Sequence, residues 1–152
     1  MKHSFLLDEN ILYHSIKGVD LHGDLDLTAM QLVVLIAKNC HNIRFNPFLL
    51  GRYRQHLAAL KNEPSKFLQP TFFETLFFGN SLKAVREDAT PPRLPASANI
   101  PNEDVDVVRA ALISRPKFVT NDTALMDAIN ACEALHLVAI TPAQAIPLAS
   151  ET

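Results

Sequence analysis

The sequence has few of the features that mark disulfide-rich, thiol-based or membrane proteins. Its two cysteines, Cys40 and Cys132, form no recurring pattern, which argues against a disulfide framework and against a thiolate metal site. No apolar run approaches the roughly 20 residues of a membrane-spanning helix, and the first apolar run is too short for a signal peptide. A Gly-rich phosphate-binding loop is also absent. We therefore expect a reduced, cytoplasmic protein with no membrane segment, and a small-molecule enzyme of the doubly wound type is disfavoured.

The apolar residues that are present alternate between strand-like and helix-like patterns. The chain of 152 residues is 48% hydrophobic and 20% charged, which suits one domain over 1–152 with a sizeable core. Such alternation is typical of an α/β fold with a parallel sheet. Strands are predicted at 4–8, 42–46, 117–120 and 135–140, and helices at 27–39, 47–60, 102–112, 123–131 and from Pro142 onward.

Two stretches fit this alternation less well. Residues 88–101 contain four prolines and are expected to be an irregular crossing with at most one short strand. Residues 67–78 contain five of the nine phenylalanines and are expected to form a mostly buried helix. The same cluster is also compatible with a dimer surface.

Charge is distributed unevenly along the chain although the net charge is only −2. Residues 38–66 carry a net charge of +5, whereas residues 8–26 and 101–152 each carry −4. A basic segment between two acidic ones suits a polyanion held beside a metal site. The alternative is an ordinary solvated helix face.

Three acidic residues follow or begin predicted elements in a way that brings them together. Asp8 ends the first strand, Asp122 follows the strand at 117–120, and Asp104 lies at the start of a helix. The carboxyl ends of parallel strands meet at one edge of the sheet, where ligands bind in open α/β folds. Carboxylates that converge there repel one another unless a cation joins them, and hard oxygen ligands suit Mg²⁺ or Mn²⁺.

This order and spacing of acids resembles the PIN-domain family of metal-dependent nucleases. The matching pieces are residues 5–10, 104–111 and 118–122, and the resemblance covers most of the chain in order and spacing. It implies a three-layer α/β/α fold with a central, mostly parallel sheet, bound Mg²⁺ or Mn²⁺, and cleavage of RNA. It also implies a homodimer and, for a toxin of a toxin–antitoxin pair, an antitoxin protein as partner. By the resemblance, the catalytic and metal-binding acids are Asp8, Asp104 and Asp122, supported by Asn10 and Thr120.

The sequence departs from the family at one position. The resemblance implies a Glu early in the helix after the second strand, but Arg52 stands there, and no acid occurs between Asp26 and Glu63. Glu9 is expected to point away from Asp8, because side chains alternate along an extended chain. Glu103 is therefore the predicted additional metal ligand.

Two functions stay open on this evidence. The first is an active PIN-type endoribonuclease whose basic helix contacts the phosphate backbone. The second is a catalytically degenerate PIN-like module that binds RNA or a protein, because Arg52 places a cation where a carboxylate is expected. The predicted nucleic-acid contacts are Arg52, Arg54 and Lys61.

Overall fold

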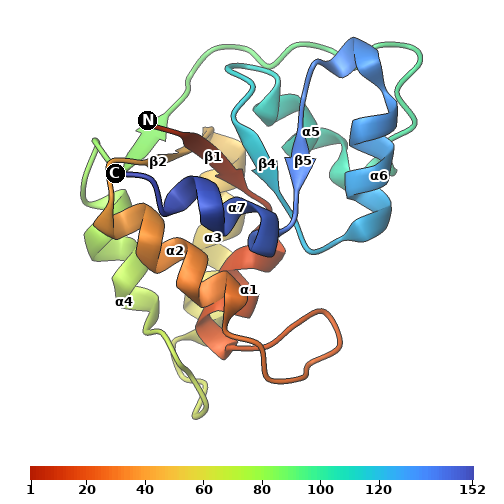
Figure 1. Cartoon of the computed structure of the whole chain (residues 1–152). Helices are drawn as coiled ribbons and strands as arrows, with labels where there is room; N and C mark the ends of the chain where they lie inside the picture. The colour runs from red at the N-terminus through yellow and green to blue at the C-terminus, as the bar shows by residue number, and fades with distance from the viewer.

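A five-stranded parallel sheet forms the centre of the protein. The computed structural model describes all residues, 1–152. The strands are β1 (Ser4–Leu7), β2 (Asn42–Phe45), β3 (Ala84–Arg86), β4 (Lys117–Val119) and β5 (Ala139–Ile140). They are hydrogen-bonded in the order β3-β2-β1-β4-β5, and every pair is parallel (Figure 1).

Helices cover both faces of this sheet. The α-helices are α1 (Glu9–Lys17), α2 (Thr28–Lys38), α3 (Pro47–Leu60), α4 (Pro70–Phe72), α5 (Val105–Ala111), α6 (Thr123–Ala131) and α7 (Pro142–Ala149). The connections from β1 to β2 and from β3 to β4 cross the sheet in opposite directions, so right-handed crossovers place α2 and α5 on opposite faces. In Figure 1, α2 and α7 pack side by side in front of the sheet. The predicted three-layer α/β/α class is therefore confirmed.

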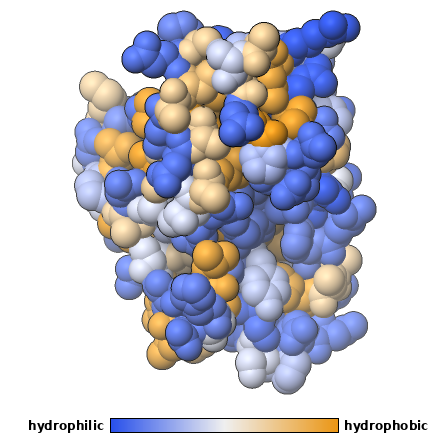
Figure 2. All heavy atoms as spheres, turned by 90° about the vertical axis from the view of Figure 1, so that its right-hand side faces the viewer, coloured by the Kyte–Doolittle hydropathy of each residue, from blue (hydrophilic) through white to orange (hydrophobic).

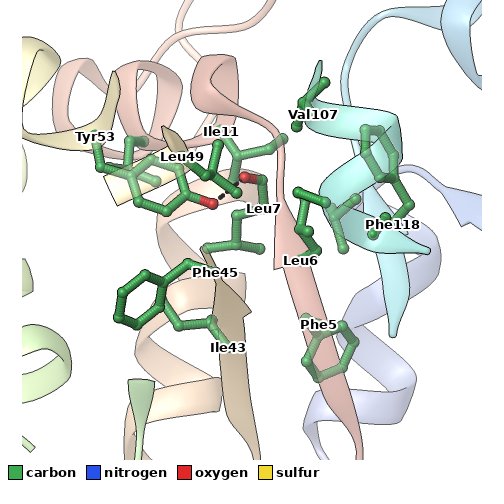
Figure 3. Close-up of a cluster of buried hydrophobic side chains, with 14 of the residues drawn as sticks. Phe5, Leu6, Leu7, Ile11, Ile43, Phe45, Leu49, Tyr53, Val107 and Phe118 are labelled. Carbon is green, nitrogen blue, oxygen red and sulfur yellow. Dashed lines mark hydrogen bonds between the residues drawn. The ribbon is translucent and has the colours of Figure 1, made fainter. Parts of the chain in front are cut away.

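The central strand β1 lies in the middle of the hydrophobic core. Phe5, Leu6 and Leu7 have no exposed surface. The side chains around them come from β2, β4, α1, α3 and α5 (Figure 3). The Tyr53 hydroxyl of α3 donates a hydrogen bond to the carbonyl oxygen of Leu7, at the point where β1 ends. Burial raises the pKa of Tyr53 well above its ordinary value, so the hydroxyl keeps the proton that this bond needs.

Helix α1 is one of two elements that the sequence patterns do not predict, and the edge strand β3 is the other. Asp8, predicted as the last residue of a strand, is the N-cap of this helix, and its Oδ1 accepts a hydrogen bond of 2.8 Å from the Glu9 backbone N–H. Gly18 ends the helix in the left-handed conformation, with φ of 67°. A Cβ there would also lie 2.4 Å from the Phe67 ring, so both the backbone and the packing require glycine.

The Phe-rich segment is helical but not a regular α-helix. Helix α4 continues into a π-helix, Phe73–Phe78. Phe73 and Phe77 are fully buried, in agreement with the prediction of core packing, whereas Phe67 is 56% exposed. The crossing that follows contains no strand, because β3 ends at Arg86, ahead of the prolines.

Two predicted boundaries are wrong. Asn102 does not cap a helix but begins a short 3-10 turn, Asn102–Asp104, that leads into α5. The last strand is limited to β5 because a 3-10 turn, Glu133–Leu135, occupies the start of the predicted range. The Asn130 side chain of α6 takes the place of a neighbouring strand there, with bonds of 2.9 Å to the N–H and carbonyl of Ala139.

None of the helices is long and apolar enough to cross a bilayer. The face that carries α6, turned to the viewer in Figure 2, is mostly hydrophilic, with its apolar atoms in separate groups.

Candidate functional site

The candidate site lies at the carboxyl edge of the sheet, where the chain changes direction across it. From β1 the chain crosses to β2 and β3 on one side, and β4 and β5 lie on the other. The loops after β1 and β4 therefore diverge and leave a gap, the position where α/β folds bind ligands. Asp8 follows β1, Asp122 follows β4, and Asp104 lies at the start of α5.

Asp8 is held in this gap by hydrogen bonds from both loops. Its side chain is 6% exposed. Besides the bond from Glu9, Asp8 accepts a bond of 2.8 Å at Oδ2 from the Thr120 hydroxyl. Thr120 Oγ1 in turn accepts a bond of 3.0 Å from the Asp122 backbone N–H. Thr120 thus connects the loop of Asp8 to the loop of Asp122, and both oxygens of Asp8 are fixed in place.

Burial makes ionisation of these acids unfavourable when no cation is bound. Burial raises the pKa of Asp8 to about 6, and the charges of Asp104 and Glu9 act in the same direction, while the bonds from Thr120 and the Glu9 N–H oppose them. The pKa of Asp104 is also raised, first by burial and then by the charges of Asp122, Glu103 and Glu9. Crowding contributes as predicted, but burial is the larger cause at both acids.

Asp8 and Asp104 line one small hollow, which we call the acidic hollow. Its other acids are Glu9 and Glu103, and its cation is Arg52; Phe48, Leu49 and Val107 complete the wall. The free space holds little more than one water molecule, which also suits a single metal ion. Ionised carboxylates around so small a space repel one another. A hard divalent cation would relieve this repulsion.

Asp122 lies at the margin of this arrangement. It does not line the acidic hollow, and its Oδ1 accepts a bond of 3.0 Å from the Leu125 N–H, as the N-cap of α6. Its charge still acts on Asp104. In this conformation no three His, Cys, Asp or Glu side chains are grouped closely enough to hold a metal ion. Joint metal binding by the three Asp residues therefore stays a prediction.

Glu9 corrects the sequence-based expectation. It was expected to point away from Asp8, but it lines the acidic hollow, because the chain turns into α1 directly after Asp8 and is no longer extended. Its Oε2 lies 3.5 Å from Arg52 Nε and 3.6 Å from His56 Nε2. Sequence reasoning also missed His56. Two residues could have predicted α1 and therefore the position of Glu9: Asp8 as the N-cap and Gly18 as the C-terminal glycine.

Arg52 does not bind the three Asp residues. Its ion pair is with Glu9, and its guanidinium carbon lies 5.5 Å from the centroid of the Phe48 ring. The cation at the position of the missing Glu is therefore at the rim of the acidic hollow, held by an acid from α1. Both side chains are partly exposed, at 44% for Arg52 and 36% for Glu9.

The other predicted site residues lie outside the acidic hollow. The Asn10 Oδ1 is buried and has no hydrogen-bond partner. Arg54 and Lys61 line a different hollow between α3 and the π-helix, together with Glu74 and Phe78. Only the first turns of the basic helix α3 therefore border the acidic hollow.

Comparisons with known proteins show a likeness in structure. No family model matches the sequence, and no curated protein matches it. The structure is similar to that of a PilT N-terminus domain protein from the hyperthermophilic archaeon Sulfolobus solfataricus P2. The two share 10% sequence identity over 100% of this chain and 96% of that chain, with a TM-score of 0.48.

Proposed function

We propose that this chain is a metal-dependent endoribonuclease of the PIN type. The observation that supports this most is the acidic hollow, where Asp8 and Asp104 meet at the switch point of a parallel sheet. Burial raises the pKa of both acids and so disfavours their ionised forms. A bound cation would stabilise these ionised forms.

The residues of the acidic hollow have distinct roles in this proposal. Asp8, Asp104 and Glu103 would hold Mg²⁺ or Mn²⁺, with Asp122 beside them. Thr120 fixes the orientation of Asp8 through its hydroxyl. A bound ion supplies Lewis acidity toward a phosphate oxygen and lowers the pKa of a water ligand. Arg52, at the rim, would contact the phosphate of an RNA strand.

A second function, a PIN-like module without catalysis, is favoured by one specific observation. The ion pair of 3.5 Å between Arg52 and Glu9 places a positive charge in the wall of the acidic hollow. This charge opposes a metal cation. In that case the chain would bind RNA or a protein partner, such as an antitoxin, and would not cut RNA.

Cleavage of an end-labelled single-stranded RNA tests the proposal. We expect fragments in the presence of Mn²⁺ or Mg²⁺ and none with EDTA. Asp8→Asn and Asp104→Asn should each lower the rate by roughly 10²-fold or more, because metal binding contributes several kcal/mol to such reactions. Asp106→Asn is the matched control. Asp106 is an exposed acid of α5, the helix that begins after Asp104, and its side chain does not line the acidic hollow.

Three results would count against the nuclease. Equal activity of the Asp8→Asn protein and the unmodified chain would point to a contaminating ribonuclease. An equal loss in the Asp106→Asn protein would show a general charge effect. Binding of RNA without cleavage in either metal would favour the second function.

A further inference from the structure

The opposite, amino edge of the sheet carries a strongly basic hollow. It has a volume of about 280 Å³ and no acidic residue in its lining. We call it the amino-edge hollow. The residues that matter here are Lys2, His3, Arg44, Ser114, Arg115 and Lys117. Three separate segments of the chain thus bring four permanent cations together on a protein whose net charge is −2.

Most of this charge is not neutralised within the protein. Lys2 and Lys117 make no side-chain hydrogen bond and no ion pair. Arg44 has only a long contact, 3.7 Å between its Nη1 and Oε2 of Glu87. Arg115 donates through Nε to the carbonyl oxygen of Leu135 at 3.1 Å, so its other nitrogens stay free.

Arg115 also occupies an unfavourable backbone conformation. Its φ of 53° lies in the left-handed region, which non-glycine residues rarely adopt. The bond to Leu135 holds the side chain beside the hollow. The fold therefore keeps a cation at a turn position that would suit glycine better.

We propose that the amino-edge hollow binds phosphate groups of a nucleic-acid strand, as a contact surface separate from the acidic hollow. Unpaired cations that share a concave surface focus a positive potential and attract a polyanion. The lining contains the Ser4 hydroxyl as a donor, whereas the Ser114 hydroxyl donates to Glu87 at 2.9 Å, and it has no large apolar wall for a nucleoside. Phosphate groups of a backbone fit this lining better than an organic ligand does.

The two hollows lie at opposite ends of the central strand β1. Ser4 and Asp8 lie at opposite ends of β1, and four residues of strand span about 13 Å. The inference shares a nucleic-acid partner with the proposed nuclease, but it does not depend on metal or on cleavage.

Salt-dependent binding of a labelled single-stranded RNA tests this surface. Fluorescence anisotropy would be measured in EDTA over a series of salt concentrations, for the unmodified chain and for the double variant Lys2→Gln, Lys117→Gln. Each phosphate contact to a single strand contributes about 0.7 to the slope of log K against log salt, so the double variant should lose about 1.4. The matched control is Lys38→Gln, Arg93→Gln, which removes two exposed cations that lie outside every hollow and form no ion pair.

The outcomes separate this inference from its alternatives. A loss of slope in the first double variant, with a smaller change in the control, supports the amino-edge hollow. An unchanged slope, or an equal loss in the control, overturns it. Inorganic tripolyphosphate could instead bind in a way that depends on Lys2 and Lys117 while replacing these residues leaves RNA binding unchanged. That result would also overturn the inference and would indicate a small-anion site. If RNA is cut but the slope is unchanged, this inference fails alone; if the slope falls but nothing is cut, only the nuclease fails.

Discussion

Asp8 is a buried acid whose cost to the fold can be measured directly. Its pKa is raised from 3.8 to about 6 in the folded chain, so the folded state holds the proton more tightly than the unfolded state. Stability is therefore lost as the pH rises from 3.8 to about 6 and stays low above that window. Asp8→Asn removes this titration and keeps a side chain of the same shape.

We expect the Asp8→Asn protein to be more stable than the unmodified chain above pH 6 in EDTA. The difference should be about 2–3 kcal/mol at most, from about 1.4 kcal/mol per pKa unit, and should shrink as the pH falls toward 4. Urea unfolding followed by circular dichroism at a series of pH values measures it. Asp106→Asn serves as the control and should show no such trend. A less stable Asp8→Asn protein above pH 6 would mean that the fold stabilises the ionised carboxylate.

Arg52 should affect metal binding through Glu9. The two side chains are partly exposed and 3.5 Å apart, so their ion pair contributes about 0.2–1 kcal/mol. Arg52→Gln releases Glu9, which already lines the acidic hollow, from its ion pair and should raise Mn²⁺ affinity by up to about fivefold. The double variant Arg52→Gln, Glu9→Gln should lose the gain. Calorimetric titration with Mn²⁺ decides, and a gain that persists in the double variant would show that Arg52 repels the ion directly.

At the scale of elements, Lys83 stands directly before the edge strand β3 and forms hydrogen bonds to the C-terminal end of α2. Its Nζ donates to the carbonyl oxygens of Ile36 at 2.9 Å and His41 at 3.1 Å, and also to that of Asn39. These carbonyls belong to the last turn of α2 and the loop after it, where a cation is favourable.

Lys83→Ala should therefore lower the free energy of unfolding by about 1–3 kcal/mol, because it leaves several carbonyls without a donor. Guanidinium unfolding measures the change. Lys38→Ala is the matched control, since Lys38 is exposed in the same last turn and makes no side-chain hydrogen bond. Equal losses in the two variants would mean that only the helix dipole matters.

Helices could be predicted from the sequence where a capping signal stands at the start of a helical pattern of apolar residues. Helix α3 begins at Pro47, as predicted, because the Asn46 side chain accepts a bond of 2.9 Å from the Leu49 N–H and proline suits the first turn. Helix α7 has the predicted cap as well, a capping box between Thr141 and Gln144. Helix α1 was missed because its capping residue also fits the end of a strand. The length of β5 depends on Asn130, whose contact no local pattern contains.

At the scale of the whole molecule, the sequence predicted the topology of the site better than its contacts. Parallel strands place Asp8, Asp104 and Asp122 at one edge, which follows from element order alone. The partner of Arg52 and the use of Asp122 as a helix cap depend on side-chain geometry after the chain turns. The partner of Arg52 in particular can be predicted only when the start of α1 is known.

The central place of β1 also has a consequence for how the protein folds. The first strand of the sequence pairs with both β2 and β4, and the bond from Thr120 to Asp8 joins residues 112 positions apart. Closing so long a loop is slow compared with forming helices. During synthesis, Asp8 leaves the ribosome long before the strand that completes its surroundings. The acidic hollow therefore forms late, and a chain stopped before β4 would expose an unpaired edge of β1 where the finished protein has its core.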